Sequence, residues 1–177
     1  MKTKIKILLR KQFSLTALTF ALPWLFVACA THQPVISGAV GPGSSGRHSG
    51  EGQGYLLVYS DTQASPVHLD KGLSYGVHTS YSVQTQDGRR VKWVANHLGD
   101  TDEAPQLVSL PVGSYQVLAE STDYGRVTVP VVIEPFQTTK VHLQGKGSWK
   151  PVMTPTATEL VRLPDGEPIG WASLAGK

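Results

Sequence analysis

Apolar side chains recur at every second residue through the later part of this chain, and that period limits the fold more than any other feature. The clearest run is 126–133, where Val127, Val129, Val131 and Ile133 share one face. Alternation with period two is typical of a β-strand with one face in a core. This region lacks the 3.6-residue period of an amphipathic helix, and the 18 glycines and 12 prolines of the chain favour short segments joined by turns. The sequence therefore predicts an all-β fold.

The alternating region divides into seven expected strands, each bounded by turn residues. Asp87-Gly88 is a hairpin signal between two of them. In the strand that follows it, Val91, Trp93 and Ala95 share a face and are expected in the core. The seven ranges are 55–60, 77–84, 90–96, 106–110, 114–121, 126–133 and 138–143. Short strands at this spacing favour an antiparallel β-sandwich.

A familiar order of residues ends this region. The chain reads Leu110-Pro111-Val112-Gly113-Ser114-Tyr115-Gln116-Val117, then Tyr124-Gly125, Val127-Thr128-Val129 and Thr139-Lys140-Val141-His142-Leu143. Over 107–143 this order resembles the end of a carboxypeptidase regulatory-like domain, one of the transthyretin-like sandwiches. The resemblance implies a seven-stranded Ig-like or prealbumin-like sandwich over 55–144. It also implies an accessory role in spacing, folding or binding, without catalytic residues.

Residues 1–28 have the layout of a secretory signal peptide. Five basic residues and no acidic one precede an uncharged apolar run from Phe13 to Ala28. A retained membrane anchor is the alternative, but this run of about 16 residues is shorter than the ~20 that a spanning helix needs. Removal of the segment leaves 11 Lys and Arg against 13 Asp and Glu. Because these charges are scattered, nucleic acid is not an expected partner.

The apolar run ends in Leu25-Phe26-Val27-Ala28-Cys29-Ala30, which resembles a bacterial lipobox. The resemblance implies cleavage before Cys29 and acylation of its thiol by fatty acids such as palmitate. Cys29 is the only cysteine, so no disulfide can form within the chain. Two acyl chains anchor a protein stably to a membrane. We therefore expect a lipid-anchored protein of the cell envelope, at the outer membrane or cell surface. An incidental cysteine in an uncleaved leader is the alternative.

Two segments flank the expected sandwich. Residues 29–54 are rich in glycine and serine, so beyond Cys29 they are expected to be a disordered tether. Residues 145–177, the C-terminal extension, contain two short runs around Pro164-Asp165-Gly166-Glu167 and predict a hairpin. The hairpin either adds strands to the sandwich or recognises a partner. The first is favoured, because an isolated hairpin is marginally stable in water.

Few residues suggest chemistry. Asp100, Asp102 and Glu103 fall within one loop and could hold a calcium ion, although a solvated acidic turn explains them as well. The six histidines are dispersed and match no HxH or HExxH spacing. The sequence therefore predicts no catalytic residues, no metal site and no cofactor.

Trp149 and Trp171 are the candidate ligand-binding residues. We expect a non-enzymatic, lipid-anchored envelope protein whose sandwich is a structural or protein-interaction module. Its partners would be the membrane, through Cys29, and an envelope protein or glycan. Carbohydrate binding on exposed aromatic rings is the alternative function, and a small envelope hydrolase is a third. Coplanar, exposed rings at Trp149 and Trp171 would favour glycans, and convergent carboxylates or histidines in a pocket would favour an enzyme.

Overall fold

The computed structural model describes residues 36–47, 52–64, 76–97, 104–152 and 159–173. All of them belong to one unit, His32–Lys177. They form strands and loops, and among them there is no helix that could span a bilayer. The predicted all-β class is confirmed. The signal peptide, Cys29 and the acidic loop with Asp100, Asp102 and Glu103 lie outside the described residues.

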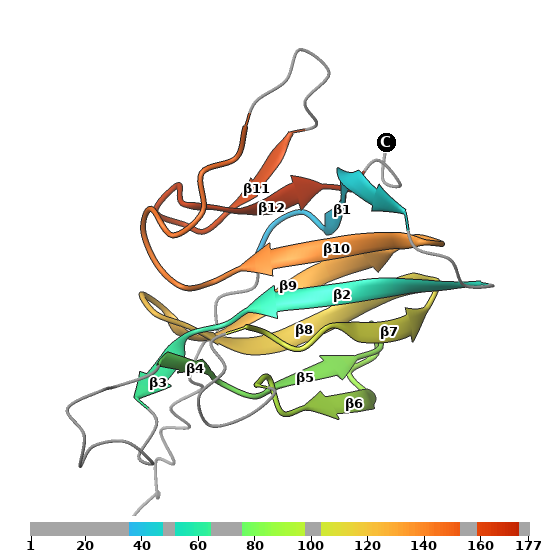
Figure 1. Ribbon diagram of the computed structural model, residues 1–177, viewed down its shortest axis with the longest axis horizontal. Coiled ribbons are helices and arrows are strands. Elements are labelled where there is room, and N and C mark those ends of the chain that lie inside the picture. The colour runs from blue at the N-terminus through green and yellow to red at the C-terminus, as the bar shows by residue number, and fades with distance from the viewer. Residues whose placement is uncertain (1–35, 48–51, 65–75, 98–103, 153–158, 174–177) are drawn as a thin grey trace, which may run out of the picture. The chain divides into compact units, whose positions relative to one another are not determined.

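The described residues form twelve strands rather than the seven that the alternation predicts (Figure 1). Three of the additional strands lie outside the predicted sandwich range, one before it and two after it. The strands are β1 (Val40–Arg47), β2 (Gln53–Tyr59), β3 (Thr62–Ala64), β4 (Gly76–His78), β5 (Tyr81–Gln84), β6 (Arg90–Val94), β7 (Val108–Pro111), β8 (Gly113–Ser121), β9 (Gly125–Ile133), β10 (Gln137–His142), β11 (Leu160–Arg162) and β12 (Pro168–Ala172).

Ten of these strands make one curled, mixed sheet. Its order is β6-β5-β8-β9-β1-β10-β2-β7, with β12 paired to β1 and β11 paired to β12, while β3 and β4 pair separately. The expectation of an antiparallel arrangement is wrong for two pairs, because β10 runs parallel to β2 and β1 runs parallel to β9. Side chains alternate with period two in both kinds of sheet, so the sequence pattern carries no information on strand direction.

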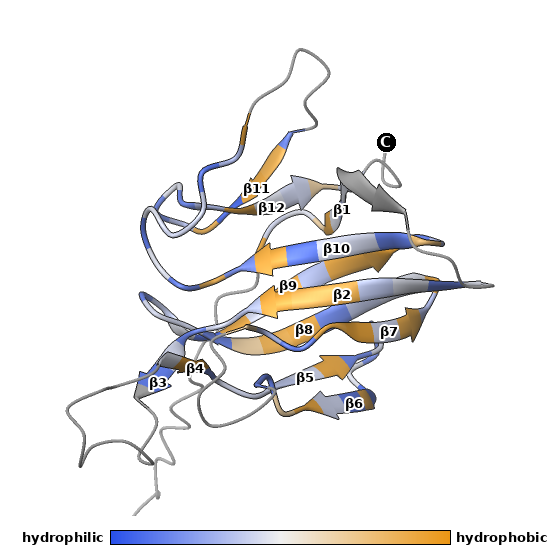
Figure 2. Ribbon diagram, viewed as in Figure 1, coloured by the Kyte–Doolittle hydropathy of each residue, from blue (hydrophilic) through white to orange (hydrophobic). Residues whose placement is uncertain are grey.

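The curl wraps the sheet around one core. Alternate residues of β2, β8, β9 and β10 are buried, and together they form a single cluster. Figure 1 shows β2 and β10 in front of β8 and β9, and Figure 2 shows the apolar stretches along β2, β8 and β9. The predicted inward faces of 114–121, 126–133 and 138–143 are confirmed at these buried residues: Val117, Ala119, Val127, Val129, Val131, Ile133, Thr139, Val141 and Leu143.

Strand β1 joins the two halves of the sheet. Val40 pairs with β9 and β12, whereas Pro42 pairs with Thr139 of β10. A Cβ on Gly41 would lie 2.7 Å from the Cα of Ser173, so the backbones approach too closely for a side chain.

The prediction of a disordered tether over 29–54 is therefore wrong at 40–47 and 53–54, where β1 and the start of β2 are formed. The physical reason lies in the glycines. They give this segment little apolar surface of its own, but they allow close backbone contact with strands formed by the rest of the chain.

The C-terminal extension forms the predicted hairpin, β11 and β12, and adds it to the sheet. Ile169 of β12 is fully buried in the common core. A Cβ on Gly170 would clash with Cγ1 of Val40, so β12 lies closely against β1. Lys146 forms an ion pair with Asp165 at the turn of the hairpin (3.4 Å). The extension is thus part of the same structural unit as the preceding strands.

Strand β6 presents a face that differs from the predicted one. Val91 is 44% exposed and Trp93 is 58% exposed, whereas Val94 is buried. Trp93 stands opposite Ser82 of β5, whose neighbours Tyr81 and Val83 point into the core. Because residues directly opposite each other share a face, Trp93 lies on the outer face of the sheet. The prediction that Val91, Trp93 and Ala95 line the core is wrong.

Candidate functional site

A buried polar cluster holds the end of β2 in place. Asn96 Nδ2 donates to the Val58 carbonyl (2.7 Å) and to Ser60 Oγ (3.0 Å). Ser60 Oγ donates to the Thr79 carbonyl (2.7 Å), and Nδ1–H of His78 donates to the Ser60 carbonyl (2.7 Å). These contacts divide the strand predicted over 77–84 into β4 and β5. Buried polar groups with such partners stabilise a fold, so we assign this cluster a structural role.

A set of four aromatic rings lies on the outer face of the β2–β10 half of the sheet, and we call it the aromatic stack. Tyr59 and His142 are opposite each other in the register, and their rings stack at 4.5 Å. Trp149 stacks on the other face of His142 at 4.4 Å. Trp171 meets Trp149 edge-on, with centroids 6.0 Å apart and planes at 89°. The stack thus fixes the C-terminal extension to the sheet.

The aromatic stack does not form a flat binding platform. Trp149 and Trp171 are perpendicular and only partly exposed, so the coplanar arrangement that would favour glycans at this pair is absent. A Cβ on Gly43 would lie 2.9 Å from Cδ1 of Trp171, which places that indole directly against β1. A hollow of about 120 Å³ beside the rings is too small for a drug-sized ligand, because such pockets occupy ~300–1,000 Å³.

His142 is held in its neutral form within the aromatic stack. Burial, with a smaller contribution from the charge of Lys140, lowers the pKa of His142 to about 4. The ring therefore carries no charge at neutral pH, and Nε2 has no hydrogen-bond partner in the described part of the chain. A neutral imidazole between two aromatic rings is suited to packing.

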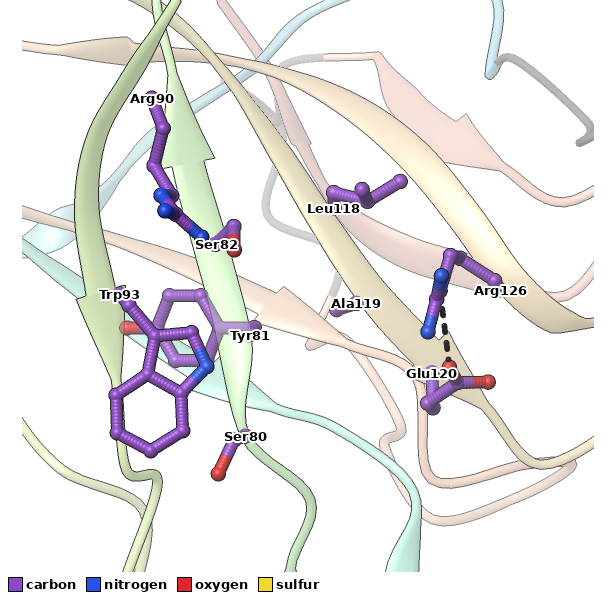
Figure 3. A pocket seen from close by; sticks show the side chains of 9 residues that line it. All are labelled: Ser80, Tyr81, Ser82, Arg90, Trp93, Leu118, Ala119, Glu120 and Arg126. Atoms are coloured by element: carbon purple, nitrogen blue, oxygen red, sulfur yellow. Dashed lines mark hydrogen bonds and ion pairs between the residues drawn. The ribbon is translucent and has the colours of Figure 1, made fainter.

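A second hollow lies on the outer face of β5, β6, β8 and β9, and we call it the Trp93 groove. Its volume is about 230 Å³. Figure 3 shows Trp93 and Arg90 on one side of it and the pair Glu120 and Arg126 on the other, with Leu118 between them. The complete lining is Ser80, Tyr81, Ser82, Arg90, Trp93, Leu118, Ala119, Glu120 and Arg126.

Strand register builds the Trp93 groove. Ser82 lies opposite Trp93 on one side and opposite Leu118 on the other, so three adjacent strands place these side chains in one row. In the next row toward the strand ends, Glu120 is paired with Arg126. Their side chains form an ion pair at 3.1 Å. The groove therefore has a regular sheet as its floor, an aromatic ring at one edge and charged groups at both edges.

A third hollow of about 310 Å³ lies beside the small β3–β4 sheet. It is lined by Tyr59, Thr62, Gly76, His78 and Gln144, with no carboxylate among them. Its histidine, His78, is already bonded to the Ser60 carbonyl. The lining therefore pairs this histidine with no carboxylate.

The structure brings together only part of what the sequence singles out. Trp149 and Trp171 meet, but as packed rings. In the described residues, no three histidine, cysteine or carboxylate side chains gather as metal ligands would.

Sequence reasoning missed Trp93, although a signal for it was present. If Asp87-Gly88 formed a two-residue turn, the hairpin register would set Ser82 opposite Trp93, and Ser82 belongs to the polar face of its strand. The observed turn is one residue longer, because the N–H of Thr85 donates to the Arg89 carbonyl, and a register shift between Val83 and Gln84 then brings Ser82 opposite Trp93. Pairing with Ser82 in the hairpin therefore indicates that the indole of Trp93 lies on the solvent-facing side of the sheet. The exposed aromatic in a groove, rather than the tryptophan pair of the extension, is the strongest candidate site.

Comparison of the chain with protein families, curated proteins and solved structures finds no match. Function must therefore be inferred from the geometry of the two aromatic regions. Of these, only the Trp93 groove combines an exposed ring with polar and charged side chains around a hollow.

Proposed function

We propose that this chain is a non-enzymatic, lipid-anchored protein of the cell envelope whose β domain binds another envelope component through the Trp93 groove. The observation that carries the proposal is the 58% exposure of Trp93 on a regular sheet. Single exposed valines and leucines need no special explanation. An exposed indole beside a hollow differs, because aromatic residues and arginine are enriched where proteins bind partners.

The anchoring part of the proposal rests on the sequence of the N-terminus. A basic segment, an apolar run and the lone Cys29 follow one another as in bacterial lipoproteins. Ile36 is buried in the core, and its N–H donates to the Thr128 carbonyl (3.1 Å). Ile36 lies seven residues after Cys29, and this length of chain reaches at most about 25 Å. A lipid on Cys29 would therefore keep the domain close to the membrane surface, at the outer membrane or cell surface.

The proposal includes a fold relationship. The resemblance of 107–143 points to the Ig-like or prealbumin-like sandwiches, in which two layers share one core. The curl of the sheet around a single buried cluster supports this assignment. Domains of that kind act as accessories, which agrees with a binding role.

Two measurements test the proposed function. Fatty-acid labelling in the native host should be abolished by Cys29→Ser, and persistence of the label would refute the anchor. Cross-linking of the full-length lipoprotein in intact envelopes should give a product that is lost in Trp93→Ala and kept in Phe136→Ala. Phe136 is the matched control because it is an exposed aromatic residue outside the groove. Equal products from both variants would refute binding through the groove.

A further inference from the structure

We infer that the Trp93 groove binds a glycan that carries carboxylate groups, an inference that rests on the proposed binding function of the domain. Sugar rings have one face of C–H groups and an edge of hydroxyl groups. A site for them therefore needs a flat apolar surface with hydrogen-bonding groups beside it. The Trp93 groove provides both in one hollow.

The indole of Trp93 supplies the flat surface. Figure 3 shows the ring broadside, lying beside Ser82 of β5 and Ser80, which precedes that strand. Trp93 is 58% exposed, so a large part of the indole is open to a ligand. An indole offers a large apolar area at a small cost in side-chain entropy, because it has only two rotatable bonds. A pyranose ring can stack on it without a change in the strands beneath.

Polar groups around the ring supply the hydrogen bonds. Ser82 of β5 and Ser80, just before that strand, contribute hydroxyl groups to the lining. Nε of Arg126 is engaged by Glu120 at 3.1 Å. Arginine has five N–H donors, so the remaining donors of Arg126 are available to a ligand. Glu120 adds an acceptor for sugar hydroxyls. The groove thus presents donors and acceptors at fixed spacing on a rigid sheet.

Arg90 gives the preference for an acidic glycan. Its side chain borders Trp93 and makes no ion pair or hydrogen bond within the described residues. Arg126 is compensated by Glu120, so the lining as a whole has an excess positive charge from Arg90. After removal of the signal segment the chain has more acidic than basic residues, 13 against 11. Attraction of an anion would therefore be a property of this groove and not of the whole surface.

Size and composition distinguish a glycan from a protein partner. A stable protein interface buries about 800 Å² on each side around an apolar centre. Trp93 is the only large exposed apolar side chain in the lining of the groove. The hollow of about 230 Å³ lies below the ~300–1,000 Å³ of pockets that enclose drug-sized ligands. One or two sugar rings lying on the sheet fit it better than a folded partner does.

Isothermal titration of the full-length lipoprotein in detergent micelles tests the inference. The probes are an oligogalacturonate and a neutral oligogalactan of the same length. The oligogalacturonate should bind more tightly, and raised salt should reduce this difference because exposed charges are screened. Trp93→Ala should weaken binding of both probes about tenfold or more. Arg90→Gln should weaken only the oligogalacturonate, about threefold. Phe136→Ala is the matched control and should bind as the unaltered protein does.

The outcomes separate this inference from the proposed function. Absence of binding to both probes, or binding that is unchanged in Trp93→Ala, overturns the glycan site. Equal affinity for both probes overturns the preference for a carboxylate. If the glycan site fails while the Trp93-dependent cross-linked product persists, the domain still binds a partner through the groove and only its chemical class is wrong. If that product is also absent, the proposed function fails as well.

Discussion

The two outer faces of the curled sheet use aromatic side chains in opposite ways. On the β2–β10 half, Tyr59, His142 and Trp149 stack on one another and are capped by Trp171 from the extension. On the β5–β6–β8–β9 half, the indole of Trp93 lies open beside a groove. The first face is closed by the chain's own C-terminal extension. The second face is left open in the described structure.

This difference shows that the neighbours of an aromatic residue decide its role. Trp149 lies in a polar, proline-bearing link and Trp171 in the short hairpin after it, which suggests that both rings are free to bind a ligand, yet they pack against each other. Trp93 alternates with apolar residues, which suggests burial, yet it is exposed. We therefore interpret the aromatic stack as a structural feature and the Trp93 groove as a binding surface.

The largest expected effect is on the aromatic stack. Trp149→Ala removes the ring that covers His142 and supports Trp171. Loss of a largely packed tryptophan should lower the free energy of unfolding by about 3 kcal/mol. Urea denaturation measures this value. A loss below about 1 kcal/mol would mean that the extension is not held by the stack.

Stability should also fall in acid because of His142. Its pKa is about 4 in the folded protein, against 6.5 for an ordinary histidine. Between these values the unfolded chain binds more protons, so the stabilising contribution is complete above pH 6.5 and is lost as the pH falls toward 4. We expect a loss of about 2 kcal/mol between pH 7 and pH 4.5 from this group. His142→Phe keeps a ring in the stack and should remove this part of the pH dependence. An identical pH profile for the variant would contradict the assignment.

A smaller effect is expected where β1 touches the stack. In Gly43→Ala the new methyl group would lie 2.9 Å from Cδ1 of Trp171. Overpacking of this kind should destabilise the fold by about 1 kcal/mol. A double-mutant cycle with Trp171→Leu checks the cause, because a shorter side chain should remove most of the cost. Additive effects of the two substitutions would show that the contact is not responsible.

The smallest effect on stability is expected in the Trp93 groove. Trp93→Ala removes a ring that is more exposed than buried. Its free energy of unfolding, measured by urea denaturation, should change by no more than about 0.5 kcal/mol, as is usual for surface positions. A loss comparable to that of Trp149→Ala would place Trp93 in the structural framework and not in a binding surface.

Much of the central sheet could be predicted from the sequence. In β8 and β9, apolar residues alternate without interruption and a turn at Asp123-Tyr124-Gly125 joins the strands. Local pattern and turn chemistry therefore agree, and Val117 and Val129 are buried as expected. The same agreement holds for the C-terminal hairpin around Pro164 and Gly166.

The remaining features depend on contacts between distant segments. The pairing of β2 with β10 joins residues such as Tyr55 and Thr138, which no tight turn connects, so the pattern left their relative direction open. Strand β1 is glycine-rich and gains its order from β9, β10 and β12. The site was missed for a local reason, because the alternation in 90–96 was assigned to the core without the hairpin register that places Trp93 beside Ser82.

The most direct test of the two roles measures binding and stability together in Trp93→Ala and Trp149→Ala. Titration with the oligogalacturonate is performed at a temperature where circular dichroism shows both variants to be folded. We expect that Trp93→Ala loses binding and keeps its stability, whereas Trp149→Ala loses stability and keeps its binding. The reverse result, with unchanged binding in Trp93→Ala and lost binding in folded Trp149→Ala, would contradict the assignment of binding to the Trp93 groove and of a structural role to the aromatic stack.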